Sequence, residues 1–353
     1  MKICQLASYN KNIGDNAAIY NIRSFFSNVE WNDYDLNNFY EIKNQINKSI
    51  EMLTKLNDSN DAFLLGGGGL IEGGIYNNFD TGWKLPFNKQ TLKAITKPIF
   101  CVALGVNYFR GIEKLNKTGV ENLKLLIEKS SFFSVRNDGS AEILKSLGIK
   151  NFVEIPDPGL IFSKNKNRQK KMLKGMFQPA MNLTPRINQY RDLTVENLSF
   201  LETFCKENNL ISLPHTPKDY LFFNSVKNCV EKDQLMNLLK KENYSESLKF
   251  YEENDYCIAM RGHGQLISCG LNVPSLYLST QNKVLGYGVK NGYKKFMIDT
   301  YDKNWKQKLL DRHKTLIQSN DFINEWYEIN ESNIVNYRKT FKEAMEHIKS
   351  SLA

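Results

Sequence analysis

The sequence predicts an α/β protein of two Rossmann-like domains that face a central cleft, with a helix at the C-terminus. Short apolar runs alternate with longer amphipathic stretches along the chain, which is typical of parallel sheets covered by helices. At 353 residues the chain is long for a single hydrophobic core. The alternation stops at Pro156-Asp157-Pro158-Gly159 and a basic run, and then starts again. These observations favour two domains joined by a linker.

In the first half, short apolar runs are predicted as β-strands and the amphipathic stretches between them as helices. The strands are expected at residues 3–6, 62–65, 99–104, 132–135 and 152–155, and the helices at 41–56, 118–128 and 141–147. Gly148 follows the last of these helices, at the position where a glycine commonly ends one.

The second half repeats the pattern. Strands are expected at residues 179–184, 211–213, 256–260 and 274–278, and helices at 198–208, 232–241, 245–253, 265–269 and 332–352. The apolar residues of the last helix share one face, which favours packing on protein over adsorption to a membrane. The predicted division is an N-terminal domain at 1–163, a basic linker at 164–178, a C-terminal domain at 179–330 and a terminal helix at 331–353.

Composition excludes several classes of protein. With 41% hydrophobic and 24% charged residues, the chain is neither disordered nor fibrous. No apolar run approaches the roughly 18 residues of a membrane span. The apolar stretch at the N-terminus is too short for a signal peptide and fits a first strand better. The six cysteines form no C-x-x-C pair, so reduced, mostly buried thiols and a cytoplasmic protein are expected.

The charge of the chain favours anionic partners. Its formal net charge is +9 and its pI is about 9.0. Residues 164–174 place six positive charges in eleven positions, which a solvated linker explains most simply. The alternative is peripheral contact with an anionic membrane at its inner face, or with a lipid-linked substrate. Nucleic acid is not expected, because no base-stacking motif accompanies the charge.

Loops that follow strands are the candidate sites, because open α/β sheets bind ligands outside the carboxyl ends of their strands. The first such loop, residues 12–17, contains Gly14 for a tight turn. Asp15 or Asn16 can cap a helix that begins at Ala17, or can hold a sugar hydroxyl or an anion.

The second loop, residues 66–74, holds six glycines in nine positions. Such a loop is costly to order and lets a ligand approach the backbone closely. It is neither a Walker loop nor a dinucleotide fingerprint, because no Gly-Lys-Ser/Thr follows and the βαβ context is wrong. Glu72, its only carboxylate, is suited to orient or deprotonate an acceptor hydroxyl.

Two later strand tips carry arginine. At residues 134–138, Asp138 suits a helix N-cap and Arg136 can simply pair with a carboxylate. After the strand at 256–260, Arg261 and His263 share a turn into a helix, whose N-terminus favours negative charge. The guanidinium fork suits phosphate or carboxylate, and histidine exchanges protons near neutral pH. This turn predicts a site for a small dianion.

Two further residues, Arg186 and His215, also follow predicted strands and are expected to converge on that site. Metal is not expected, because the histidines at 215, 263, 313 and 347 lack metal-ligand spacing. A serine hydrolase is not indicated either, because no G-x-S-x-G is present.

Taken in order, these segments resemble the polysaccharide pyruvyltransferase family. The resemblance covers residues 13 to about 288 and is carried by Ile13-Gly14-Asp15, Gly66 to Gly69 with Leu70, Ser134-Val135-Arg136 with Asp138 and Ser140, Asp157-Pro158, Arg261 with His263, Tyr277, and residues 283–286. Family members usually have leucine between the last arginine and histidine, where this chain has Gly262. The substitution keeps both functional side chains.

The resemblance implies a fold like that of the GT-B glycosyltransferases and an enzyme that moves the pyruvyl group of phosphoenolpyruvate onto a sugar as a cyclic ketal. The acceptor would be a cell-surface polysaccharide, such as a capsule or exopolysaccharide, or its lipid-linked precursor. The C-terminal domain would bind phosphoenolpyruvate through Arg186, Arg261, His263, Gly264 and His215, with His263 and Arg261 catalytic. The N-terminal domain would bind the sugar through Asp15, Asn16, Gly67, Gly68, Glu72 and Arg136. No cofactor beyond the donor substrate is implied.

Two other functions stay open at this point. A nucleotide-sugar glycosyltransferase would share the fold, although the pair of glutamates eight residues apart that retaining members often carry is absent after Met260. A non-catalytic protein that binds glycans or anions during envelope assembly is the second alternative. Turnover of phosphoenolpyruvate to phosphate separates all three.

Overall fold

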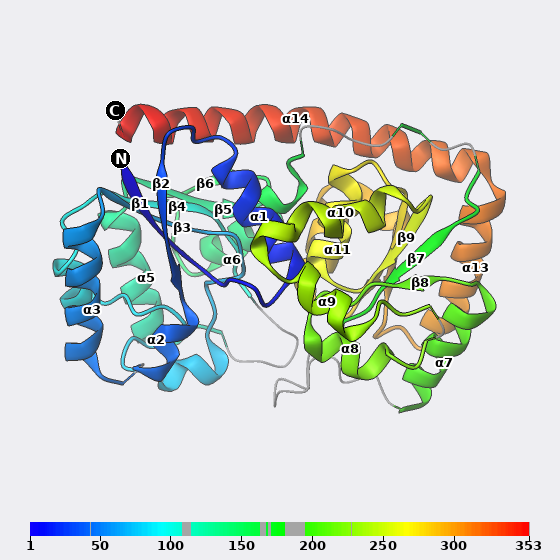
Figure 1. Ribbon diagram of the computed structural model, residues 1–353, viewed down its shortest axis with the longest axis horizontal. Coiled ribbons are helices and arrows are strands. Elements are labelled where there is room, and N and C mark those ends of the chain that lie inside the picture. The colour runs from blue at the N-terminus through cyan, green and yellow to red at the C-terminus, as the bar shows by residue number, and fades with distance from the viewer. Residues whose placement is uncertain are drawn as a thin grey trace.

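The computed structural model describes residues 1–42, 44–107, 114–162, 167–168, 171–180, 195–226 and 228–352. Within these residues the chain forms a six-stranded and a five-stranded sheet, both parallel, which lie side by side and are covered by helices (Figure 1). The predicted fold of two Rossmann-like halves is therefore confirmed. The division into domains at 163, 178 and 330 stays a prediction.

The first sheet has the order β2-β1-β3-β4-β5-β6. Its strands are β1 (Lys2–Ala7), β2 (Glu30–Asp35), β3 (Ala62–Gly66), β4 (Ile99–Leu104), β5 (Phe132–Arg136) and β6 (Val153–Ile155). Its helices are α1 (Ile13–Arg23), α2 (Asn37–Glu41), α3 (Ile46–Ser59), α4 (Lys89–Lys93), α5 (Lys117–Lys129) and α6 (Ser140–Ser146). The five strands expected in this half are confirmed, whereas β2 was missed because its sequence, EWNDYD, is polar and half-exposed.

Two helices of the first half begin at other residues than predicted. The helix expected at 41–56 starts at Ile46, after the separate short helix α2. The helix expected from Ala17 starts at Ile13, because the Asn12 side chain accepts a hydrogen bond from the Gly14 amide at 2.9 Å and caps it there. Asp15 is therefore not the cap and lies in the first helical turn.

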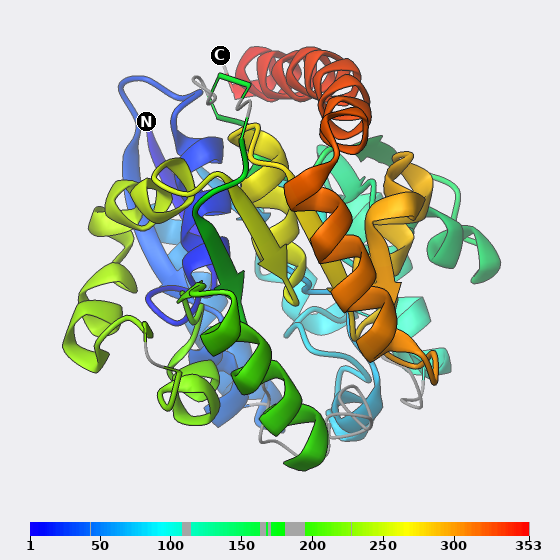
Figure 2. The ribbon, with the colours of Figure 1, turned by 90° about the vertical axis from the view of Figure 1, so that its right-hand side faces the viewer.

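The second sheet has the order β11-β10-β9-β7-β8. Its strands are β7 (Gly175–Gln178), β8 (Ile211–Ser212), β9 (Tyr256–Ala259), β10 (Ser275–Ser279) and β11 (Met297–Asp299). Its helices are α7 (Val195–Glu207), α8 (Pro217–Phe223), α9 (Lys232–Leu238), α10 (Tyr244–Glu252), α11 (Gly262–Gly270), α12 (Asn282–Lys290) and α13 (Trp305–Gln318). Figure 2, which looks onto this half, shows α7 and α13 in front of its strands.

The strand expected to begin at Pro179 does not begin there, because Pro179 and Ala180 are not part of a strand. The strand that pairs with β9 is β7, which lies within the stretch expected to be the linker. Pro179 directly follows it, and proline has no N–H to continue a ladder. Residues 181–184 lie outside the described residues.

The C-terminal helix joins the two halves. Helix α14 (Asn320–Leu352) begins twelve residues earlier than predicted and runs across both sheets (Figure 1). Over the second half, Trp326 Nε1 donates to Tyr277 Oη at 3.2 Å and Asn330 Nδ2 donates to the Cys269 carbonyl at 3.0 Å. Over the first half, the Phe341 ring packs on Phe25 with the ring centroids 5.4 Å apart.

One hydrophobic cluster consequently runs through both halves. It takes in α1, one face of the first sheet, the second sheet and the buried side of α14. The opposite face of the first sheet has its own cluster, formed with α3, α4 and α5. All six cysteines lie within the described residues as unpaired thiols, and five of them are buried. Among the helices described, none combines the length and apolarity that crossing a bilayer requires.

We expect Phe341→Ala to destabilise the protein by about 3 to 5 kcal/mol, because it leaves a cavity between α14 and the first half. Val335→Ala is the matched control on the same helix, since Val335 is 69% exposed, and it should change stability by less than about 0.5 kcal/mol. Urea unfolding of both variants measures the difference. Equal losses of unfolding free energy in the two variants would mean that packing of α14 on the first half does not stabilise the protein.

Candidate active site

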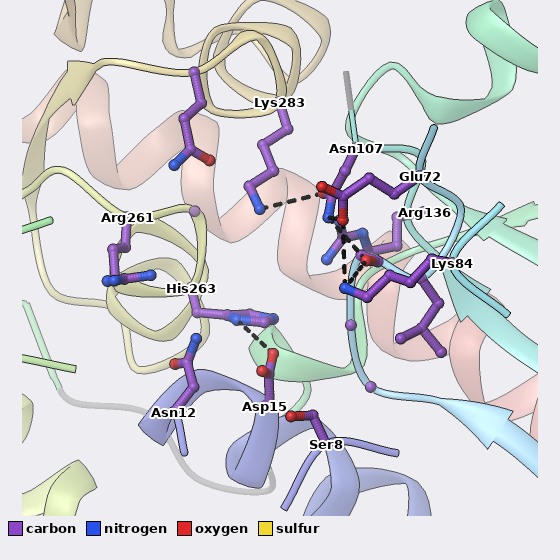
Figure 3. Close-up of a pocket in the computed structure, with 16 residues that line it drawn as sticks. Ser8, Asn12, Asp15, Glu72, Lys84, Asn107, Arg136, Arg261, His263 and Lys283 are labelled. Atoms are coloured by element: carbon purple, nitrogen blue, oxygen red, sulfur yellow. Dashed lines mark hydrogen bonds and ion pairs between the residues drawn. The ribbon is translucent and has the colours of Figure 1, made fainter. Parts of the chain in front are cut away.

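The carboxyl ends of strands from both sheets border a pocket of about 240 Å³ between the two halves (Figure 3). This volume suits a small ligand, since pockets for drug-sized molecules start at about 300 Å³. Sixteen of the described residues line it: Ser8, Asn12, Asp15, Gly67, Gly68, Gly69, Leu70, Glu72, Lys84, Asn107, Arg136, Arg261, Gly262, His263, Gln281 and Lys283. The strand-tip loops that the sequence indicated thus meet at one place.

His263 reaches from the first turn of α11 into the first half, where its ring lies between two carboxylates. Its Nδ1 is 3.4 Å from Asp15 Oδ1 and its Nε2 is 3.7 Å from Asp157 Oδ1. Two glycines make room for the ring. A Cβ on Gly14 would lie 2.1 Å from His263 Cβ, and a Cβ on Gly159 would lie 3.0 Å from His263 Cδ2.

The two carboxylates beside His263 have different environments. Burial raises the pKa of Asp15, and the nearby charges of His263 and Lys283 only partly offset this. Burial alone would raise the pKa of Asp157 as well, but the charges of Arg136 and His263 hold it well below its usual range. Asp157 is therefore a permanent anion, whereas Asp15 gains a proton more readily than an ordinary aspartate.

Arg261 is held in place by a carboxylate that the sequence did not reveal. Its Nε and Nη2 donate to the two carboxylate oxygens of Asp219, each at 2.7 Å. Its backbone N–H donates to Gln178 Oε1 at 2.8 Å. Such a two-point pair fixes the plane of the guanidinium. Arg261 therefore presents a fixed positive group at the pocket wall.

The opposite wall combines Glu72, Lys84 and Asn107. Lys84 Nζ lies 3.3 Å from Glu72 Oε2, and Asn107 Nδ2 donates to the same oxygen at 3.4 Å and to the Gly69 carbonyl at 2.8 Å. A Cβ on Gly69 would lie 2.2 Å from Asn107 Oδ1, so this glycine lets the amide approach. The wall offers both hydrogen-bond donors and acceptors, as a sugar requires.

Lys283 spans the pocket from the second half to the first. Its Nζ donates to Asn107 Oδ1 at 3.4 Å. Burial and the charge of Arg136 lower the pKa of Lys283 to about 8. Arg136 itself is paired with Asp157 at 2.8 Å and with Asp138 at 3.0 Å. An anion bound in the pocket would favour the charged form of Lys283.

Some predicted site residues lie outside the pocket wall. His215 is buried and its Nε2 is 2.7 Å from Tyr251 Oη, while burial lowers its pKa well below the usual value. Asn16 donates to the Leu239 carbonyl at 2.8 Å and so joins the two halves. Gly264 faces Gln178, whose Oε1 would be 2.4 Å from a Cβ there. Arg186 lies outside the described residues.

The structure adds pocket residues that were not among the predicted ligands. Five of them lie in segments that the sequence analysis had singled out, namely Asn12, Gly69, Leu70, Gly262 and Lys283, whereas Ser8, Lys84, Asn107 and Gln281 were not indicated. Lys283 belongs to the segment 283–286 that carries the resemblance, and it follows β10, where the rule that ligands bind beyond strand ends also places a ligand. Lys84 lies in an irregular segment that is not adjacent to a strand, and no sequence signal indicates it. In the described part of the chain, no group of three or more His, Cys, Asp or Glu side chains is arranged for a metal ion.

Two parallel Rossmann-like sheets with a ligand-sized pocket between them define the GT-B-like class of transferase fold. Solved structures with this fold are similar to the chain. They include S. aureus MnaA with UDP (14% identity, TM-score 0.53, covering 99% of this chain and 96% of that one). Methanocaldococcus jannaschii UDP-GlcNAc 2-epimerase with UDP-GlcNAc and UDP is also similar (13% identity, TM-score 0.50, covering 90% of this chain and 93% of that one). Acinetobacter baumannii MurG is a third similar structure (10% identity, TM-score 0.50, covering 99% of each chain). At these identities the likeness shows the fold alone.

The chain matches the polysaccharide pyruvyl transferase family over residues 7–282, and it belongs to that family. Among curated proteins no match was found. The family assignment confirms the resemblance drawn from the motifs and makes the protein a transferase. The non-catalytic alternative is thereby set aside.

We expect Gly14→Ala to destabilise the protein by about 1 to 3 kcal/mol through overpacking against His263, although alanine favours a helix. Gly68→Ala is the control in the same pocket, because its Cβ would meet its nearest atom, Asp15 Oδ1, at an ordinary 3.6 Å. Thermal unfolding compares the two variants. A Gly14→Ala variant as stable as the wild type would show that the His263 ring does not lie against α1.

Proposed function

We propose that this protein transfers the pyruvyl group of phosphoenolpyruvate onto two hydroxyls of one sugar, as a cyclic ketal, and releases phosphate. The sugar belongs to a cell-surface polysaccharide or to its lipid-linked precursor. The observation that carries the proposal is one small pocket that combines the basic side chains of Arg261, His263 and Lys283 with two carboxylates, Asp15 beside His263 and Glu72 beside Lys84.

The basic side chains of the pocket suit the donor. Phosphoenolpyruvate carries a phosphate and a carboxylate in a small molecule, and Arg261 and Lys283 offer one fixed and one adaptable cation to them. Arg136, predicted as a ligand of the acceptor sugar, lines the same pocket, and its charge is paired with Asp138 and Asp157. Arg186 stays a predicted donor ligand.

The reaction begins with a proton from His263 to the methylene carbon of the donor, so that the C2=C3 electron pair forms the new C–H bond. C2 becomes an oxocarbenium-like centre, and the first sugar hydroxyl adds to it and loses its proton. Phosphate then leaves with the electrons of the C2–O bond. The second hydroxyl adds to C2 and its proton ends on phosphate. Positioning of the three reacting groups supplies much of the rate.

The wall formed by the glycine loop, Glu72 and Lys84 suits the acceptor. Gly67 and Gly68 allow a sugar to approach the backbone, and the pair of Glu72 and Lys84 can accept from one hydroxyl and donate to its neighbour. A second cavity of about 420 Å³ shares Asn12, Asp15 and Arg261 with the pocket. It has room for the next part of a longer acceptor. Contact of the basic stretch with a lipid diphosphate or the inner membrane face stays a prediction, although Arg168 within that stretch pairs with Glu331 at 2.6 Å.

A nucleotide-sugar glycosyltransferase is the second candidate. It is favoured by the fold that the chain shares with proteins solved in complex with UDP or UDP-GlcNAc. Phosphate release from phosphoenolpyruvate in the presence of an acceptor, against UDP release from nucleotide sugars, separates the two.

We expect wild-type protein to release phosphate from phosphoenolpyruvate only when a suitable glycan is added, with the pyruvyl group appearing on that glycan by mass spectrometry. His263→Ala should lower this rate by about 10²- to 10⁴-fold, because it removes the proton donor. His347→Ala, an exposed histidine on α14, is the control. Full turnover by His263→Ala would remove His263 from the mechanism.

We expect donor binding to weaken as pH rises through about 8, because Lys283 loses its charge there. Burial has the largest effect on this pKa and lowers it. Among nearby charges, Arg136 and Arg261 lower the pKa further, whereas Asp138 and Asp15 raise it. In Lys283→Arg the same pH range should leave binding unchanged, since arginine stays charged. Lys283→Met should bind the donor roughly ten- to a hundredfold more weakly below pH 8. Calorimetry measures all three, and an unchanged pH dependence in Lys283→Arg would contradict this role.

A further inference from the structure

The two ring nitrogens of His263 face different surroundings. Nδ1 lies beside Asp15, which lines the pocket, so this nitrogen is on the side of the substrates (Figure 3). Nε2 is buried, has no hydrogen-bond partner among the described residues, and lies 3.7 Å from Oδ1 of Asp157, which lines neither the pocket nor the second cavity. The ring thus has a reactive side and an anchored side.

Asp157 is buried and held by hydrogen bonds from two other groups. It is 2% exposed. Its Oδ1 accepts from the Gly159 amide at 2.7 Å, and its Oδ2 accepts from Arg136 Nη1 at 2.8 Å. An anion held this way can orient an imidazole through its Nε2–H, as carboxylates beside catalytic histidines do. Asp157 therefore has the geometry of a positioning residue.

Asp15 has the geometry of a group that exchanges protons. It lies in the first turn of α1, lines both the pocket and the second cavity, and places Oδ1 3.4 Å from Nδ1 of His263. Burial raises its pKa, which supports transient protonation. The pKa values of the two aspartates beside one histidine are thus shifted in opposite directions, the pattern that marks different roles in acid–base chemistry.

We propose that Asp15, His263 and Asp157 form a proton relay, in which Asp157 anchors the ring through Nε2–H and a proton passes from an acceptor hydroxyl to Asp15, on to Nδ1 of His263, and from there to the donor. This rests on the proposed function and assigns its missing base. Asp15, previously expected to bind the sugar, is catalytic, and Asp157 is positioning.

The relay balances the reaction. Nδ1–H gives its proton to the methylene carbon, which takes up the C2=C3 electron pair. The first hydroxyl then bonds to C2 and its proton goes to Asp15. Asp15 returns that proton to Nδ1, so His263 is ready for the next cycle. The second hydroxyl proton leaves with phosphate, and no further acid or base is consumed.

The anchoring step is tested without substrate. Histidine-selective ¹⁵N labelling resolves the tautomers of the four histidines in this chain. Neutral His263 should carry its proton on Nε2 in the wild type and shift towards Nδ1 in Asp157→Asn. Asp138→Asn is the matched control, because it removes the other carboxylate on Arg136, and it should leave the tautomer unchanged. A wild-type Nδ1–H tautomer, or no shift in Asp157→Asn, overturns the anchoring role.

The exchange step is tested by chemical rescue. Asp15→Ala and Asp157→Ala should both lower turnover by about 10²- to 10⁴-fold, with donor binding changed less than about threefold. Formate should restore turnover to Asp15→Ala, whose missing carboxylate faces the pocket, and not to Asp157→Ala, whose position is closed to solvent. Absence of rescue in Asp15→Ala overturns the relay. If wild-type protein itself does not turn over phosphoenolpyruvate, the proposed function fails, while the tautomer measurement still decides the anchoring role.

Discussion

The placement of His263 between carboxylates of the other half is the constraint on which the site depends. The residue belongs to the second sheet, yet its ring occupies space left by Gly14 and Gly159 of the first half. The pocket therefore exists only when the halves are docked in this one arrangement. Asn16, which joins α1 to the Leu239 carbonyl, and α14, which packs on both sheets, maintain that arrangement. Residues far from the chemistry thus determine whether donor and acceptor groups meet.

Burying this many charges is costly unless each is paired, and the site pairs its cations systematically. Arg261 has Asp219, Lys84 has Glu72, and Arg136 has Asp157 and Asp138. These pairs hold the charged groups in fixed positions before any ligand binds, so little reorganisation accompanies the reaction. Lys283 differs from these cations in its pKa, which is lowered to about 8, so that its charge responds to what enters the pocket.

The sequence predicted the buried, apolar strands of the fold well and the polar, exposed ones poorly. An apolar strand such as β4 is recognised from its run of hydrophobic residues, whereas the edge strand β2 is polar and has no such run. In the site, Arg261 and His263 were found because they follow a buried strand. Their partners Asp219 and Asp157 act through three-dimensional contacts over 42 and 106 residues of chain, which spacing cannot reveal. His215 follows a strand as well, but its side chain turns to Tyr251 in the core, because strand position alone does not fix direction.

The most direct test of pyruvyl transfer follows the oxygen that bridges C2 and phosphorus in the donor. Phosphoenolpyruvate labelled there with ¹⁸O is turned over with the acceptor glycan, and the released phosphate is analysed by ³¹P NMR, which resolves the isotope shift. Ketal formation breaks the C2–O bond, so the account predicts phosphate that retains the ¹⁸O, together with a glycan that has gained the pyruvyl group. Phosphate without the label would mean that the P–O bond breaks, and it would contradict pyruvyl transfer at this site.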